Sequence, residues 1–207
     1  TTSSIFSSFT LLINLLHHVI NTTERTINEV FMRVDNDKEI LDYNISEELA
    51  NRIKTLIKNG DLEGLKQQDV NFSKPVILDK TGKTPLLYAC YCGQLDIVKY
   101  LLDDQKTDPN QTCKQNRTAL IYACYANKPK IVKLLVNKEA VKLDIQDAFG
   151  WTALMHAAFD WFHKPVKILL DDNDLKRQAD PTIKNVAGQN ALLLAAAKII
   201  FVDTEEN

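Results

Sequence analysis

The chain has 207 residues, 45% hydrophobic and 25% charged, so it can bury a sizeable core and falls in the ordinary soluble globular class. Its formal net charge of -2 gives no field that attracts a polyanion, which disfavours nucleic acid or an acidic membrane surface as a partner. The four cysteines, in a chain far larger than a disulfide-dependent secreted scaffold, favour a reduced, cytoplasmic setting.

Residues 1–44 are expected to form an N-terminal helical cap or extension. Apolar residues three to four apart in 5–20 and again in 27–34 predict two helices, with a capping-box pattern at Asn21 and Glu24 between them. Polar residues interrupt the first stretch and no basic residue precedes it, so we expect neither a signal peptide nor membrane insertion. The alternative to a cap is a segment for self-association or for binding a partner.

Residues 45–78 carry the next predicted helices. Ser46 followed by Glu47 and Glu48 is a plausible helix start, with apolar residues at helical spacing behind it. The segment NGDLEGLKQQ (59–68) aligns with CGQLDIVKYL (92–101), and this places Gly60 one period before Gly93. The alignment indicates an irregular first copy of a repeated unit.

Four later segments superpose without gaps: GKTPLLYAC (82–90), NRTALIYAC (116–124), GWTALMHAA (150–158) and GQNALLLAA (188–196). The first three are each followed by an apolar segment, at 95–102, 129–136 and 163–170, so each unit supplies two short helices. The links between units mix Asp, Asn and Pro with extended residues and suit hairpin-like turns.

The residue types of the repeat have physical reasons. Gly82, Gly150 and Gly188, with Asn116 in register, fit a position of positive φ, because glycine lacks a Cβ and asparagine is its best-tolerated substitute. The threonine that follows two residues later can cap a helix start, and Pro85 suits the first helical turn. The alanines at 89, 123, 157 and 195 are small where neighbouring helices must approach closely.

These segments resemble the ankyrin-repeat family, with its period near 33 residues and its T-P-L-H-x-A signature, over about residues 45–200. The resemblance implies an all-α fold, a solenoid of stacked helix-turn-helix units. We expect residues 45–207 to form this domain, with an irregular first repeat at 45–78, repeats at 79–112, 113–146 and 147–184, and a partial repeat at 185–202. The sequence departs from the family pattern where Leu87, Ile121 and Met155 replace the signature histidine, and where four extra residues occur around 171–178.

No motif for catalysis, for a metal or for a cofactor occurs among the four histidines and four cysteines. The nearest approach to a reactive pair is Cys124 with His156, on equivalent helices of adjacent repeats. Cys124 occupies an alanine-like position, which favours a buried, inert thiol. We therefore expect no enzyme activity, no cofactor and no metal.

An aromatic pattern predicts a binding surface. Tyr91, Tyr125 and Phe159 recur at a spacing of 34 residues, at a position where the family varies and faces the groove, and aromatic residues anchor protein interfaces. The remaining predicted partner-binding residues are Tyr88, Tyr122, His156, Phe149, Trp151, Trp161, Lys83 and Arg117. We expect Tyr88, Tyr122 and His156 to be partly buried between repeats, and simple packing is the alternative reading of the whole pattern.

The sequence therefore predicts a protein-protein interaction module that binds a partner protein through a concave groove and the turn tips. Two alternatives stay open at this point. The region could be the targeting domain of a larger enzyme or effector whose catalytic part is outside this chain. It could also be a structural or inhibitory subunit that masks a partner's surface.

Overall fold

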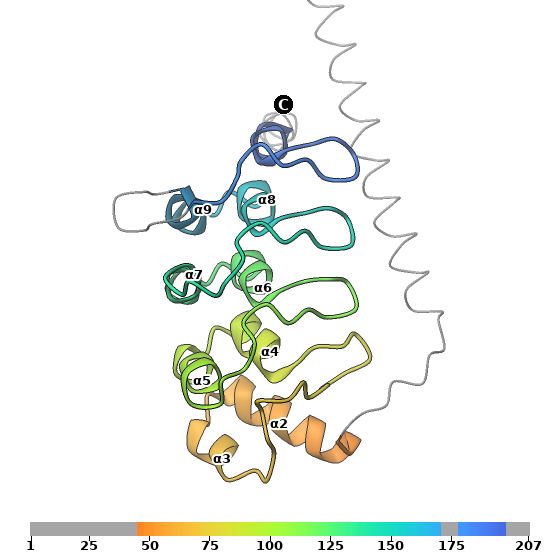
Figure 1. The fold of residues 1–207 in the computed structure, drawn as a ribbon, viewed down its shortest axis with the longest axis vertical. Coiled ribbons are helices and arrows are strands. Elements are labelled where there is room, and N and C mark those ends of the chain that lie inside the picture. Colours follow the sequence, from red (N-terminus) through yellow and green to blue (C-terminus); the bar gives the residue numbers. More distant parts are fainter. Residues whose placement is uncertain (1–44, 171–177, 198–207) are drawn as a thin grey trace, which may run out of the picture. The chain divides into compact units, whose positions relative to one another are not determined.

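A computed structural model of the chain describes residues 45–170 and 178–197, and Figure 1 shows how their helices are arranged. The two helices expected within residues 1–44 lie outside the described residues. This applies both to the expected cap and to its alternative, a segment for self-association or for binding a partner. Within the described residues every regular element is helical, which confirms the all-α stack of helix pairs.

The first helix of each repeat contributes to one layer of the stack and the second helix to another (Figure 1). The first layer contains α2 (Glu47–Asn59), α4 (Pro85–Cys92), α6 (Ala119–Tyr125) and α8 (Ala153–Phe159). The second layer contains α3 (Leu62–Lys66), α5 (Leu95–Lys99) with the π-helix η1 (Tyr100–Asp104), α7 (Pro129–Val136) and α9 (His163–Leu170). In the first layer α2 packs on α4, α4 on α6 and α6 on α8.

Helix α2 begins and ends as the sequence predicts. The Ser46 hydroxyl accepts a hydrogen bond from the Leu49 N–H at 3.2 Å, and Gly60 ends the helix in the left-handed conformation. The buried side chains of Ala50, Ile53 and Ile57 form its packed face, so the core of the described stack begins at α2.

Threonine caps are present at two of the three predicted helix starts. The hydroxyls of Thr118 and Thr152 accept hydrogen bonds from the N–H groups three residues later, both at 3.3 Å. The prediction is wrong for Thr84, whose buried hydroxyl has no hydrogen-bond partner. Pro85 occupies the first helical position there, as expected.

Close packing of the first layer depends on small residues. Ala89, Ala123 and Ala157 have no exposed surface, and neither do Cys90 and Cys124 one position later. A larger side chain at these positions would separate adjacent helices, because protein cores are packed at crystal-like density. The small residues therefore allow the first helices of adjacent repeats to lie close together.

The turns form a continuous row beside the first helices. Gly82, Asn116, Gly150 and Gly188 all have positive φ, between 56° and 77°, as the sequence predicts. Backbone hydrogen bonds join each turn to the next: Lys114 N–H to Thr81 O at 3.0 Å, Ala148 N–H to Gln115 O at 2.8 Å, and Val186 N–H to Phe149 O at 3.1 Å.

When the repeats are counted from the regular one at 79–112, the extra residues expected around 171–178 fall late in the third repeat (147–184), before the partial fourth, and 171–177 lie outside the described residues. On either side of them the Ala179 N–H donates to Leu169 O at 2.9 Å. The stack thus resumes directly after the insertion. Residues 191–197 are helical and form the first helix of the partial fourth repeat.

Candidate interaction surface

Three aromatic side chains at equivalent positions of consecutive repeats stand exposed on the first helices. Tyr91 at the end of α4 is 43% exposed, Tyr125 at the end of α6 is 45% exposed and Phe159 at the end of α8 is 39% exposed. The rings of Tyr91 and Tyr125 stack with centroids 6.5 Å apart and planes at 22°. We call these three residues the aromatic stripe.

A second row of rings, three residues earlier on the same helices, packs against the stripe. Tyr122 and His156 are buried and Tyr88 is half-buried, in agreement with the expected partial burial. Tyr122 meets the Tyr91 ring edge-on with centroids 6.2 Å apart, and His156 meets Tyr125 in the same way at 5.9 Å. Tyr122 and His156 therefore position the exposed rings and are too buried to contact a partner themselves.

The predicted aromatic surface included two residues, Phe149 and Trp151, that are buried in the structure. The turn of the fourth repeat covers Phe149, whose carbonyl accepts the Val186 N–H. Trp151 packs on the rings of His156 and Phe159, with centroids 5.1 and 5.3 Å apart. These two residues are structural supports for the turn and for the end of the stripe.

Trp161 is 44% exposed, as a surface residue should be. It follows α8 in the left-handed conformation, with φ of 56°, and its indole N–H donates to the Ala195 carbonyl at 3.1 Å. Trp161 thus ties the third repeat to the fourth and leaves part of its ring accessible.

The two predicted turn cations lie beside the aromatic residues. The Arg117 guanidinium is 5.6 Å from the centroid of the Tyr125 ring, and the Lys83 ammonium is 5.8 Å from that of Tyr122. Lys83 is paired with Asp79 at 3.6 Å, and Arg117 Nε donates to Asp147 at 3.2 Å. Both cations therefore have anionic partners within the chain.

Asp147 connects the turn to the stripe. Its Oδ2 lies 3.0 Å from His156 Nε2, and its Oδ1 accepts the backbone N–H groups of Phe149 and Trp151. Burial by itself would raise the pKa of Asp147, but the hydrogen bonds from His156 and the backbone outweigh burial and lower it. Burial also lowers the pKa of His156, and the hydrogen bond to Asp147 offsets this only in part. A neutral ring then donates from Nε2 to the carboxylate.

The described residues offer little for chemistry. Cys124 is fully buried, and burial raises the pKa of its thiol, as it does for Cys90. Since the thiolate is the nucleophile, both thiols are unreactive in the folded chain.

Among residues 45–170 and 178–197, no three His, Cys, Asp or Glu side chains are grouped so that they could hold a metal. None of the helices in the same ranges has the length and apolar character needed to cross a membrane.

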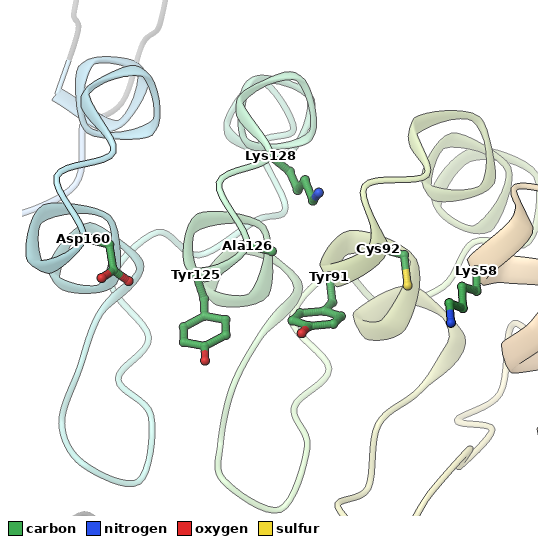
Figure 2. Close-up of a pocket in the computed structure, with 7 residues that line it drawn as sticks. All are labelled: Lys58, Tyr91, Cys92, Tyr125, Ala126, Lys128 and Asp160. Carbon is green, nitrogen blue, oxygen red and sulfur yellow. The ribbon is translucent and has the colours of Figure 1, made fainter. Parts of the chain in front are cut away.

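A pocket of about 540 Å³ opens beside the stripe, and Figure 2 shows the residues that line it: Lys58, Tyr91, Cys92, Tyr125, Ala126, Lys128 and Asp160. The sequence analysis predicted Tyr91 and Tyr125 but missed Lys58, Cys92, Ala126, Lys128 and Asp160. They lie where a first helix ends or where it joins the second helix, and lysine does not recur there. The position of Lys58 in the irregular first repeat is that of Tyr91, Tyr125 and Phe159 in the later repeats, and Gln94 and Phe162 hold the positions equivalent to Lys128. Only the recurrent glycine that ends helices α2 and α4, at Gly60 and Gly93, marks these links in the sequence.

Comparison with known proteins identifies one family. The family model described as ankyrin repeats (3 copies) matches residues 13–113, 47–147 and 105–179, which together span most of the chain. No curated protein matches the sequence significantly.

Proposed function

This chain belongs to the ankyrin-repeat family, whose repeats are generally protein-protein interaction modules, and we propose that its aromatic stripe binds a partner protein. The partner chain would lie across the exposed ends of α4, α6 and α8. The turn tips beside the stripe would contact its flanks.

The observation that carries this proposal is the exposure of Tyr91, Tyr125 and Phe159 on helices whose other large apolar residues are buried, apart from the half-buried Tyr88. A single exposed apolar residue is ordinary, but three at one repeated position form a contiguous surface. Stacking and edge-on contacts with buried rings also restrict these side chains before binding. A partner therefore gains large contact area with little loss of side-chain entropy.

We further propose that the module binds without catalysing a reaction and that it acts in the cytoplasm. The buried thiols of Cys90 and Cys124 support the first point, because neither can serve as a nucleophile. The absence of disulfides among Cys90, Cys92, Cys113 and Cys124 is consistent with a reducing compartment.

The proposal is tested by affinity capture from native cells, with the bound proteins identified by mass spectrometry. The intact chain is compared with the variant Tyr91→Ala/Tyr125→Ala/Phe159→Ala and with Tyr100→Ala. Tyr100 belongs to η1 in the second layer, so it is a matched tyrosine away from the stripe. We expect the stripe variant alone to lose a specific protein. Equal capture by all three folded proteins would reject the stripe as the binding surface.

A further inference from the structure

The pocket beside the stripe contains two ammonium groups that have no counter-ion within residues 45–170 and 178–197. Neither Lys58 nor Lys128 forms an ion pair with a carboxylate of the described residues, whereas Lys83 and Arg117 are paired with Asp79 and Asp147. Burial raises the pKa of the Cys92 thiol, and the hydrogen bond with Tyr88 and the charges of Lys128 and Lys58 all oppose that rise. Both ammonium groups therefore lie close enough to Cys92, which also lines the pocket, to influence it. An anion that entered the pocket here would meet both charges.

The two lysines lie near the ends of first helices. The Lys128 side chain lies over Gly93, where an added Cβ would be 2.9 Å from Lys128 Cδ and 3.2 Å from Nζ. Lys58 lies in the last turn of α2. Because helix C-termini carry partial negative charge, the ends of α4 and α2 favour an ammonium group without supplying a full anion. Each ammonium group therefore lies near a helix end that favours it and remains available to an anion.

Charge along the pocket is ordered. Figure 2 shows Lys58 and Cys92 at one end, Tyr91 and Tyr125 in the middle with Lys128 above Tyr91, and Asp160 at the other end beyond Tyr125. A partner segment that matches this order has an acidic group near Lys58 and Lys128 and an apolar side chain on the rings of Tyr91 and Tyr125. A basic segment would meet Lys58 at one end and Lys128 above Tyr91, and like charges at an interface oppose binding.

We propose that the partner segment is acidic, and that it places a glutamate or aspartate carboxylate between Lys58 and Lys128 while an apolar side chain covers Tyr91 and Tyr125. This inference rests on the proposed function of the stripe. A carboxylate suits the site better than a phosphate. Lysine binds a phosphate as a point charge, and geometric recognition of a phosphate comes from arginine forks or clustered backbone N–H groups. No arginine of the described residues lines this pocket, and Arg117 beside Tyr125 is already bonded to Asp147.

The test is a selection from a phage-displayed library of random peptides on the full chain. Peptides that bind the chain but not Tyr125→Ala are taken as stripe-dependent. We expect Asp and Glu to be enriched among them at one end of the peptide. Lys58→Glu/Lys128→Glu should weaken those peptides at least about tenfold and select basic ones instead. The control Lys130→Glu/Lys133→Glu makes the same change in charge at exposed positions of α7 and should retain the acidic peptides.

The possible failures are distinct. Stripe-dependent peptides without acidic enrichment would overturn the acidic-partner inference and leave the proposed function standing. The same holds for acidic enrichment that both charge-reversal variants abolish equally, since that would reflect net charge alone. No stripe-dependent peptide at all would overturn the proposed function, and the inference with it.

Discussion

Single residues at the turns share one backbone conformation but differ in their surroundings. Gly150 and Gly188 have φ of 75° and 76°. A Cβ at Gly150 would lie 2.9 Å from Val186 N and 3.0 Å from Asn185 Cα, whereas a Cβ at Gly188 would have nothing within 4 Å. The backbone strain of a non-glycine residue is therefore common to both positions, and the clash with the next repeat belongs to Gly150 alone.

We predict that Gly150→Ala lowers the free energy of unfolding by about 2 kcal/mol more than Gly188→Ala does. Gly188→Ala should show only the strain of positive φ, about 1 to 2 kcal/mol. Urea denaturation of both variants and the parent chain measures the difference. Equal losses would mean that a Cβ at Gly150 does not clash with Asn185 and Val186 of the next repeat.

His156 gives the stability of the chain a dependence on pH. Burial lowers its pKa below the ordinary value of 6.5, so the unfolded chain takes up the proton at a higher pH than the folded chain. We predict that the free energy of unfolding falls as the pH drops below about 6.5. His156→Gln should remove this part of the pH dependence, and the exposed His163→Gln should keep it. Identical pH profiles for the three proteins would contradict this role of His156.

Some residue positions were predictable from the sequence and others were not. The positive φ at Gly82, Asn116, Gly150 and Gly188 could be predicted because only glycine and asparagine recur there. The pocket lysines could not, because Lys128 has no lysine at the equivalent positions of the other repeats. Its role comes from lying over Gly93, which is a contact between repeats.

At the scale of helices, the equivalent residues Thr118 and Thr84 show that a threonine can be buried at a helix start without capping the helix. Thr118 accepts a hydrogen bond from the Ile121 N–H, and Thr84 in the preceding repeat makes no such bond. We predict that Thr118→Val destabilises the chain by about 1 kcal/mol. Thr84→Val should be neutral or stabilising, because it removes a buried hydroxyl without a partner.

Thermal melts of the two threonine variants distinguish these effects, since valine keeps the shape of the side chain. A larger loss at Thr84 than at Thr118 would show that the hydroxyl of Thr84 has a role that the hydrogen bonds do not reveal.

Helical spacing explains why only part of the aromatic pattern was predicted correctly. Residues three apart on a helix are neighbours but are rotated by about 60° about its axis, so Tyr91 and Tyr125 face outward while Tyr122 and His156 lie beneath them. The repeat period alone could identify both rows. It could not predict the burial of Phe149, because the turn that covers it comes from the next repeat.

At the scale of the whole described stack, each repeat buries its apolar face against the next, and the fourth repeat lacks that cover. Leu86, Leu120 and Leu154 are buried at one equivalent position, whereas Leu192 there is 75% exposed. Stability of such arrays depends on contacts between nearest neighbours. The same leucine therefore contributes differently in successive repeats.

We predict that Leu154→Gln lowers the free energy of unfolding by about 3 kcal/mol or more, because it places an amide in the core. Leu192→Gln should change it by about 0.5 kcal/mol or less. Guanidinium denaturation checks both values. A large loss at Leu192 would show that its side chain is covered in solution.

The central claim is that the aromatic stripe binds a partner rather than stabilising the fold, and alanine variants titrated against the captured protein test it most directly. Tyr125→Ala should weaken binding by about 2 kcal/mol, roughly thirtyfold, because Tyr125 is the middle ring. Tyr91→Ala and Phe159→Ala should weaken it less. The free energy of unfolding of Tyr125→Ala should fall by only about 1 kcal/mol or less, since the ring is 45% exposed. Loss of stability with unchanged affinity would contradict the account and assign the stripe to the core.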